Sequence, residues 1–193
     1  MEKINPNSPS YWDEVYKKEK GTGKRRIDTE RFERVVDLLT DYNNITYPNQ
    51  RTLLDVGCGN GEMLRLIHAI FPEWKLYGID ITPETISWAK GVDSFDYRVM
   101  GAEDITFSAE FFDCIFCGET LEHLENPETV IYQMKKVLKP EGFLICSVPF
   151  QDKNKSKEHL REYTIEDCLQ LTSGRLVDIN VVKGLSIIWT VKK

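Results

Sequence analysis

The chain has 193 residues, 41% of them apolar and 29% charged, which is typical of a globular domain and excludes disorder throughout. Its net charge of −6 argues against a general attraction to nucleic acid or anionic lipid. It shows neither a secretory signal pattern nor an apolar stretch long enough to cross a membrane, so we expect a cytoplasmic protein without a membrane partner.

Helical patterns open the chain, at about 11–20 and 29–42, and residues 1–45 form either a lid over a ligand or a passive brace. Strands and helices then alternate. Strands are expected at 52–56, 75–79, 97–100, 113–117 and 143–148, and helices at 62–71, 83–90, 127–138 and 164–171. Two β-rich runs joined at Lys183-Gly184 close the chain as a hairpin.

This alternation predicts an α/β fold, specifically a Rossmann-like, mostly parallel seven-stranded sheet with helices on both faces and a C-terminal antiparallel hairpin. We find no repeat and no domain boundary. The prediction is one domain, 1–193, whose core is 51–193.

Five cysteines are present, and Cys114 and Cys117 form a C-x-x-C pair. Both lie in a predicted buried strand, where residues three apart point to opposite faces. This geometry argues against a shared metal ion or a disulfide, so we expect reduced cysteines that pack in the core.

Residues 53–61 read L-L-D-V-G-C-G-N-G, which places Gly57, Gly59 and Gly61 directly after the first predicted strand. Open α/β sheets bind their ligands at this turn, and glycine lets a ligand lie against the main chain. The spacing G-x-G-x-G differs from the G-x-G-x-x-G of dinucleotide sites. It favours a nucleoside ligand without a pyrophosphate and disfavours a nicotinamide-dependent oxidoreductase.

Acidic residues follow the next two strands. Asp80 ends the second strand, where a carboxylate can accept hydrogen bonds from both ribose hydroxyls. Glu103 and Asp104 follow the third strand, and Asp104 is placed to accept a hydrogen bond from an adenine amino group. Taken singly, each aspartate also suits a strand end or a helix cap.

Five stretches together resemble the class I S-adenosylmethionine-dependent methyltransferases: L-L-D-V-G-C-G-N-G, G-I-D-I, G-A-E-D-I, F-D-C-I-F-C-G-E-T-L-E-H-L and V-L-K-P-E-G-F-L. The resemblance covers residues 51 to about 150. It implies methyl transfer from S-adenosylmethionine, with S-adenosylhomocysteine as the product. The cofactor-binding residues that it implies are Asp55, Gly57, Cys58, Gly59 and Gly61 under the methionine part, Asp80 at the ribose, Ile81 on the adenine, Glu103 and Asp104 at the adenine edge, and Glu119 near the sulfonium.

A second group concerns the methyl acceptor. Glu119, Glu122 and His123 are spaced i, i+3 and i+4, so a helical turn would place them on one face. A hydroxyl acceptor must lose its proton, and histidine is a suitable base. His123 and Glu119 are therefore the candidate catalytic residues. The alternative for His123 is a partly buried histidine bonded to a loop carbonyl.

The acceptor atom is expected to be oxygen. Enzymes that methylate the adenine amino group carry N/D-P-P-Y/F after the fourth strand, where this chain has G-E-T-L. Segments like E-T-L-E-H also occur in ubiquinone-pathway O-methyltransferases, as the resemblance implies. We therefore expect O-methylation of a small acceptor.

A metal-dependent alternative is also open, in which His159 joins Glu119, Glu122 and His123 as four O/N ligands for a divalent ion. The set resembles that of small-RNA 2′-O-methyltransferases, but the chain lacks the further histidines of those enzymes. No metal site is assigned on this basis, and a nucleic acid partner is not expected.

Two basic segments are expected at the mouth of the pocket and favour an anionic acceptor, unless their charges are simply solvated. They comprise Lys17, Lys18, Lys20, Lys24, Arg25 and Arg26, and Lys153, Lys155 and Lys157. A non-catalytic protein that binds S-adenosylmethionine as a partner or sensor is a further alternative. The oligomeric state stays open.

Overall fold

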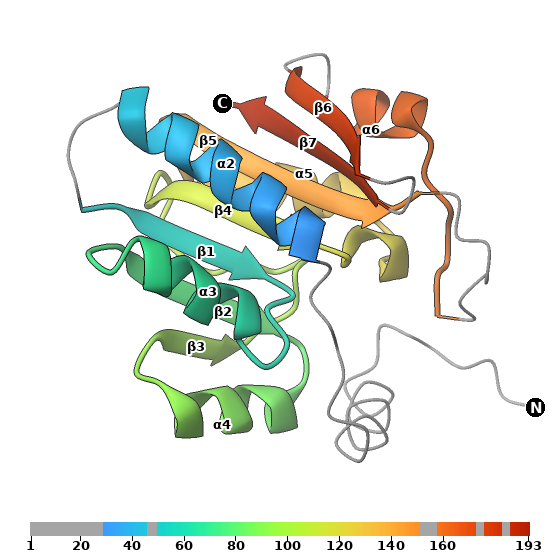
Figure 1. The fold of residues 1–193 in the computed structure, drawn as a ribbon. Helices are drawn as coiled ribbons and strands as arrows, with labels where there is room; N and C mark the ends of the chain where they lie inside the picture. Colours follow the sequence, from blue (N-terminus) through green and yellow to red (C-terminus); the bar gives the residue numbers. More distant parts are fainter. Residues whose placement is uncertain (1–28, 46–49, 151–157, 173–175, 183–185) are drawn as a thin grey trace, which may run out of the picture.

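The computed structural model describes residues 29–45, 50–150, 158–172, 176–182 and 186–193 (Figure 1). The helix expected at 11–20, the hairpin turn at Lys183-Gly184 and both basic segments lie outside these ranges. Within the described ranges, no helix combines the length and the apolar character that crossing a membrane requires.

Seven strands and six helical segments follow one another in the described chain. The strands are β1 (Thr52–Val56), β2 (Lys75–Asp80), β3 (Asp96–Val99), β4 (Phe112–Gly118), β5 (Leu138–Pro149), β6 (Leu176–Val182) and β7 (Ser186–Lys192). The helices are α2 (Thr29–Ile45), α3 (Glu62–Ile70), α4 (Pro83–Val92), α5 (Pro127–Val137), α6 (Ile165–Leu171) and the 3₁₀ turn η1 (Leu121–His123).

The strands form one sheet in the order β3-β2-β1-β4-β5-β7-β6. The first five are parallel, whereas β7 runs antiparallel to both β5 and β6. The predicted Rossmann-like sheet with its antiparallel C-terminal pair is thus confirmed. The strand order reverses between β1 and β4, so a ligand is expected outside the carboxyl ends of these strands.

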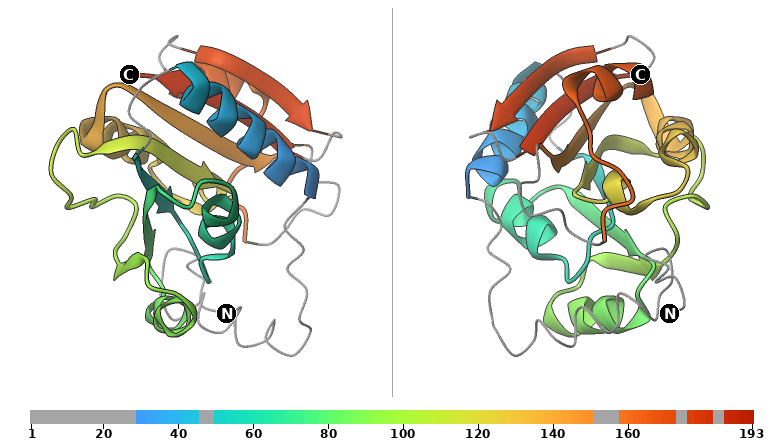
Figure 2. Two further views of the ribbon diagram at one scale, coloured as in Figure 1. Left: turned by 60° about the vertical axis from the view of Figure 1, so that its left-hand side comes forward. Right: turned by 90° about the vertical axis from the view of Figure 1, so that its right-hand side faces the viewer.

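Helices cover both faces of the sheet, as the two views in Figure 2 show for α2 and α5. Side chains of α2, α3 and α4 pack into one hydrophobic cluster, and those of α5 and α6 pack into the other. Cys114 belongs to the first cluster and Cys117 to the second, because they point to opposite faces. All five cysteines are free and buried, as predicted.

Helix α2 is fixed to the sheet by burial and by charge. Val35 and Leu39 are fully buried against the core, and Arg34 forms an ion pair with Asp178 of β6. This contact joins residues that are far apart in the sequence. The first turn of α2 lies beside the carboxyl ends of the central strands (Figure 1).

The structure corrects the predicted start of the fifth strand. We expected the strand to begin at residue 143, but β5 begins at Leu138. Leu138 is buried and pairs with Phe112, and the register shifts between Phe112 and Cys114. Burial of this leucine holds the segment in the sheet despite its turn-like composition.

Candidate cofactor and acceptor site

The loop after β1 requires glycine at two positions. Gly57 and Gly61 have φ values of 76° and 77°, a region that disfavours side chains. A Cβ atom on Gly57 would lie 2.2 Å from Oγ1 of Thr120, and one on Gly61 would lie 2.1 Å from the hydroxyl of Tyr97. The loop is therefore packed against Thr120 on one side and Tyr97 on the other.

Asp80 ties this loop to the end of β2. Its two carboxylate oxygens accept the backbone N–H groups of Gly59 and Thr82, each at 2.9 Å. The side chain is buried. Asp80 thus holds the glycine loop against the end of β2.

The residues expected on the adenine side lie at the neighbouring strand ends. Ile81 directly follows Asp80 and is half-buried, whereas Glu103 and Asp104 are exposed in the turn after β3. The backbone N–H of Met100 donates to the carbonyl of Asp80 at 2.9 Å, which holds this turn beside β2. Cys58 is buried in the glycine loop, and its backbone N–H donates to the carbonyl of Ile79 at 2.9 Å.

Asp55 lies near the carboxyl end of β1 and is only 3% exposed. Burial, followed by the charge of Asp80, raises the pKa of Asp55 to about 8, although the guanidinium of Arg31 opposes this shift. Two carboxyl groups thus face one basic group in a confined space. The arrangement favours a ligand that brings its own positive charge.

Stability of the ligand-free chain is expected to fall as pH rises from about 4 to about 8, by at most about 1.4 kcal/mol per pH unit from Asp55. The folded-state pKa of Asp55 lies above its unfolded value of 3.8, so its contribution is complete below that value and is lost as pH approaches 8. Urea unfolding across this range measures the slope. Asp55→Asn should flatten it, and parallel slopes in the two proteins would refute this origin.

Arg31 was missed in the sequence. It projects from α2, and its Nη1 atom lies 2.9 Å from Oε1 of Glu119, which also accepts the hydroxyl of Ser186 at 3.3 Å. Burial raises the pKa of the Glu119 carboxyl, and the Arg31 charge opposes the rise. A signal did exist, because Arg31 stands four residues before buried Val35 and so shares the sheet-facing side of the helix.

The predicted shared face of Glu119, Glu122 and His123 does not form. Glu119 has a left-handed φ of 51°, and the following turn starts only at Leu121. The chain therefore changes direction between Glu119 and the turn. The carboxylate of Glu119 points to Arg31 and Ser186, while Glu122 and His123 turn to other partners.

Glu122 and His123 instead gather with His159, as the sequence suggested. Nε2 of His123 lies 3.7 Å from Oε1 of Glu122, and the rings of His123 and His159 are 5.0 Å apart, edge to face. One ligand atom from each residue lies within 4.8 Å of the other two. We call these residues the Glu-His-His cluster. Glu122 is 1% exposed, so the carboxylate sits in a largely dry environment.

The segment that carries His159 is bonded to η1 through its backbone. Nδ1 of His123 donates to the carbonyl of Glu158 at 3.0 Å, and the N–H of Leu160 donates to the carbonyl of Glu122 at 2.8 Å. A carbonyl can only accept, so Nδ1 carries a hydrogen and Nε2 of the neutral ring keeps its lone pair. The two roles predicted for His123, a base and a histidine bonded to a loop carbonyl, are thus compatible. Nδ1 makes the bond to the loop, and Nε2 is the basic atom.

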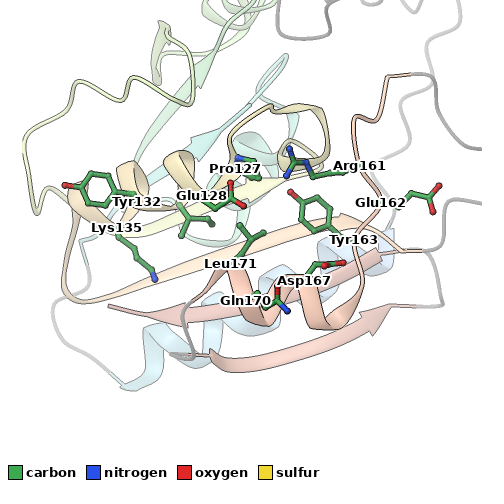
Figure 3. Close-up of a pocket in the computed structure, with 11 residues that line it drawn as sticks. Pro127, Glu128, Tyr132, Lys135, Arg161, Glu162, Tyr163, Asp167, Gln170 and Leu171 are labelled. Carbon is green, nitrogen blue, oxygen red and sulfur yellow. The ribbon is translucent and has the colours of Figure 1, made fainter.

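Behind η1 lies a cavity of about 510 Å³ between α5, α6 and the segment leading into α6 (Figure 3). Two of its polar side chains form hydrogen bonds to backbone carbonyls. Arg161 donates to the carbonyls of Leu124 and Glu125, and the hydroxyl of Tyr163 donates to the carbonyl of Leu121. This side of the molecule therefore supports the turn that presents the Glu-His-His cluster.

Comparison with known proteins gives a consistent result. Residues 54–146 match the family model described as a methyltransferase domain. Over 101 residues the chain is 35% identical to ubiquinone biosynthesis O-methyltransferase from Cereibacter sphaeroides, covering 49% of this chain and 40% of that protein. Over 170 residues it is 26% identical to malonyl-[acyl-carrier protein] O-methyltransferase from Halalkalibacterium halodurans, covering 84% of this chain and 60% of that protein.

The matched region spans about half the length of these curated relatives. A solved structure of a SAM-dependent methyltransferase from Aquifex aeolicus shares the fold, with a TM-score of 0.64 and 17% identity over 86% of this chain and 99% of that chain. The strand order, the glycine loop, the family match and these relatives agree. Together they support a class I S-adenosylmethionine-dependent methyltransferase family for this chain, with residues 54–146 as the matched methyltransferase domain.

Proposed function

We propose that this chain transfers the methyl group of S-adenosylmethionine to an oxygen atom of a small acceptor. The observation that carries the proposal is the placement of two groups at neighbouring strand ends. The glycine loop and Asp80 follow β1 and β2, and the Glu-His-His cluster follows β4 and β5. Donor and acceptor can thus meet at the edge where the strand order reverses.

The residues present fit the parts of the cofactor. Asp80 would accept the ribose hydroxyls, and Ile81 would pack on the adenine beside Glu103 and Asp104. In the methionine part, the ammonium group suits Asp55 and the carboxylate suits Arg31, which would exchange Glu119 for the ligand. When bound, the cofactor supplies the electrophilic methyl group.

The acceptor would lie against the Glu-His-His cluster. Nε2 of His123 would take the proton of an acceptor hydroxyl, and the neighbouring Glu122 carboxylate would stabilise the imidazolium that results. A carboxylate acceptor would need no base, only alignment with the methyl group. Both curated relatives described above are named O-methyltransferases, which supports an oxygen acceptor.

Asp80→Asn is expected to weaken S-adenosylmethionine binding about tenfold to a hundredfold, since hydrogen bonds to a charged group are worth about 1.5 to 3 kcal/mol. The amide also places an N–H group opposite one of the two backbone donors, Gly59 or Thr82. Calorimetric titration measures the change. Asp96→Asn is a matched control, because this exposed carboxylate pairs only with Arg98 among the interactions described. Equal affinities in wild type and Asp80→Asn would contradict the ribose assignment.

The proposed reaction is tested by incubating the purified chain with methyl-labelled S-adenosylmethionine and four acceptor sets: phenols, carboxylic acids, amines and short RNA. We expect label and S-adenosylhomocysteine only with the phenols or the acids. Labelled amines would contradict an oxygen acceptor. Labelled RNA would favour the metal-dependent RNA 2′-O-methyltransferase, and cofactor binding without transfer to any set would favour the non-catalytic partner or sensor.

The four-ligand set of the RNA alternative has less support than a three-ligand set. The Glu119 carboxylate pairs with Arg31 and Ser186, although the charge of His159 also acts on it. The convergence of the other three residues supports a metal ion without favouring RNA as the acceptor.

A further inference from the structure

We infer that the Glu-His-His cluster binds one divalent transition-metal ion of the zinc type. Its ligand atoms come from two segments that are far apart in the sequence, η1 and the residues before α6. One carboxylate oxygen and two ring nitrogens lie within 4.8 Å of one another. Ligand atoms around a tetrahedral ion, with bonds of about 2.1 Å, are about 3.4 Å apart, so small side-chain movements would close the site.

The donor set selects the class of ion. Two imidazoles and one carboxylate suit Zn²⁺, Fe²⁺ or Co²⁺, whereas Mg²⁺ and Ca²⁺ prefer oxygen ligands and water. Three protein ligands leave a coordination position open, which is the pattern of catalytic rather than structural zinc sites. The set also differs from the four-ligand arrangement considered from the sequence, since Glu119 is held elsewhere.

The surroundings of the cluster orient its ligands. The Nδ1–H group of His123 donates to the carbonyl of Glu158 at 3.0 Å, which directs Nε2 to the side of Glu122. Metal-bound histidines usually make such a bond through their other ring nitrogen. Leu160, which follows His159, is held to η1 by the hydrogen bond from its N–H group to the Glu122 carbonyl. His159 is thus fixed between two backbone contacts to η1.

Electrostatics also favour a cation here. The Glu122 carboxylate is 1% exposed, and a buried carboxylate is costly unless a positive charge or hydrogen bonds compensate it. Protonated His123 offers one such charge at 3.7 Å. A bound ion would offer a larger one and would need no proton on His123. The state with protonated His123 and the state with a bound ion therefore differ in metal content, which can be measured directly.

The role of the ion, unlike its presence, rests on the proposed function. An ion at the cluster would bind the acceptor oxygen at its open position and lower the pKa of an acceptor hydroxyl. His123 would then act as a metal ligand instead of as the base. The proton would leave to solvent, and the acceptor oxygen would form the new bond to the methyl group as the bond from that group to sulfur breaks.

The site is tested on the purified chain after chelator treatment and dialysis against Co²⁺ or Zn²⁺. We expect one ion per chain by mass spectrometry and a visible Co²⁺ spectrum typical of a low-coordinate nitrogen and oxygen site. Glu122→Gln and His159→Asn should each weaken binding by at least about a hundredfold. The third histidine of the chain, exposed His68 on α3, gives the matched control His68→Asn, which should keep the ion.

Cofactor titration separates this inference from the proposed function. His159→Asn should keep its affinity for S-adenosylmethionine while losing the ion, which also shows that the variant is folded. No ion in the wild type, or equal binding in wild type and His159→Asn, would overturn the metal site and leave methyl transfer standing. Metal binding in a chain that does not take up S-adenosylmethionine would overturn the proposed function alone.

Discussion

Gly61→Ala is expected to abolish measurable S-adenosylmethionine binding and to lower the free energy of unfolding by about 3 kcal/mol. The alanine would have to adopt the φ of 77° that Gly61 has, and its Cβ atom would lie 2.1 Å from the Tyr97 hydroxyl. Tyr97 cannot easily retreat, because its ring is 1% exposed and its hydroxyl is 3.2 Å from the carboxylate of Asp93. The loop must move instead, and with it the main chain proposed to face the cofactor.

Gly91→Ala is the control for this substitution, because Gly91 lies in α4 away from the proposed site. A Cβ atom on Gly91 would find open space within 4 Å, and this glycine is not among those with a positive φ. Urea unfolding and calorimetric titration of both variants measure the two effects. Gly61→Ala with the affinity of the wild type would show that the loop does not approach the cofactor.

His123→Asn is expected to lower kcat about 10²- to 10⁴-fold, the usual loss when a positioned base is removed. Asparagine can still donate an N–H group to the Glu158 carbonyl in place of Nδ1, but it lacks an equivalent of the basic Nε2 atom. The loss follows whether Nε2 takes the proton itself or holds the ion that we infer. Affinity for S-adenosylmethionine should change less than about threefold.

Steady-state kinetics measure kcat with an acceptor that becomes methylated in the test of the proposed function. Calorimetric titration measures the affinity for S-adenosylmethionine. His68→Asn again serves as the control, since His68 is exposed on α3 and contacts only the edge of Phe95 among the ring contacts described. Full kcat in His123→Asn would remove His123 from the reaction. A loss of cofactor affinity that matches the loss of rate would assign it a structural role.

Much of the fold could be predicted because its determinants are local. Apolar residues alternate with period 2 or 3.6 within each element, and Pro83 and Pro127 mark the helix starts. The beginning of β5 could not be predicted in this way. Leu138 joins the strand because it fills the core beside Phe112, and that contact depends on the folded sheet.

The residues of the candidate site likewise fall into those that could be predicted from the sequence and those that could not. Asp80 could be placed beside the glycine loop because parallel strands end at one edge. His159 could be expected near η1 because β4 and β5 are neighbours. The pairing of Arg31 with Glu119 could not, since it depends on how α2 docks on the sheet and on the left-handed turn at Glu119.

Calorimetric titration of the purified chain with S-adenosylmethionine, S-adenosylhomocysteine and NAD⁺ tests most directly whether the glycine loop and its flanking acids bind an adenosyl sulfonium. We expect one molecule of S-adenosylmethionine per chain, displaced by S-adenosylhomocysteine and unaffected by NAD⁺. If neither adenosyl compound binds at millimolar concentration, or if NAD⁺ binds in their place, then the assignment of this site is wrong.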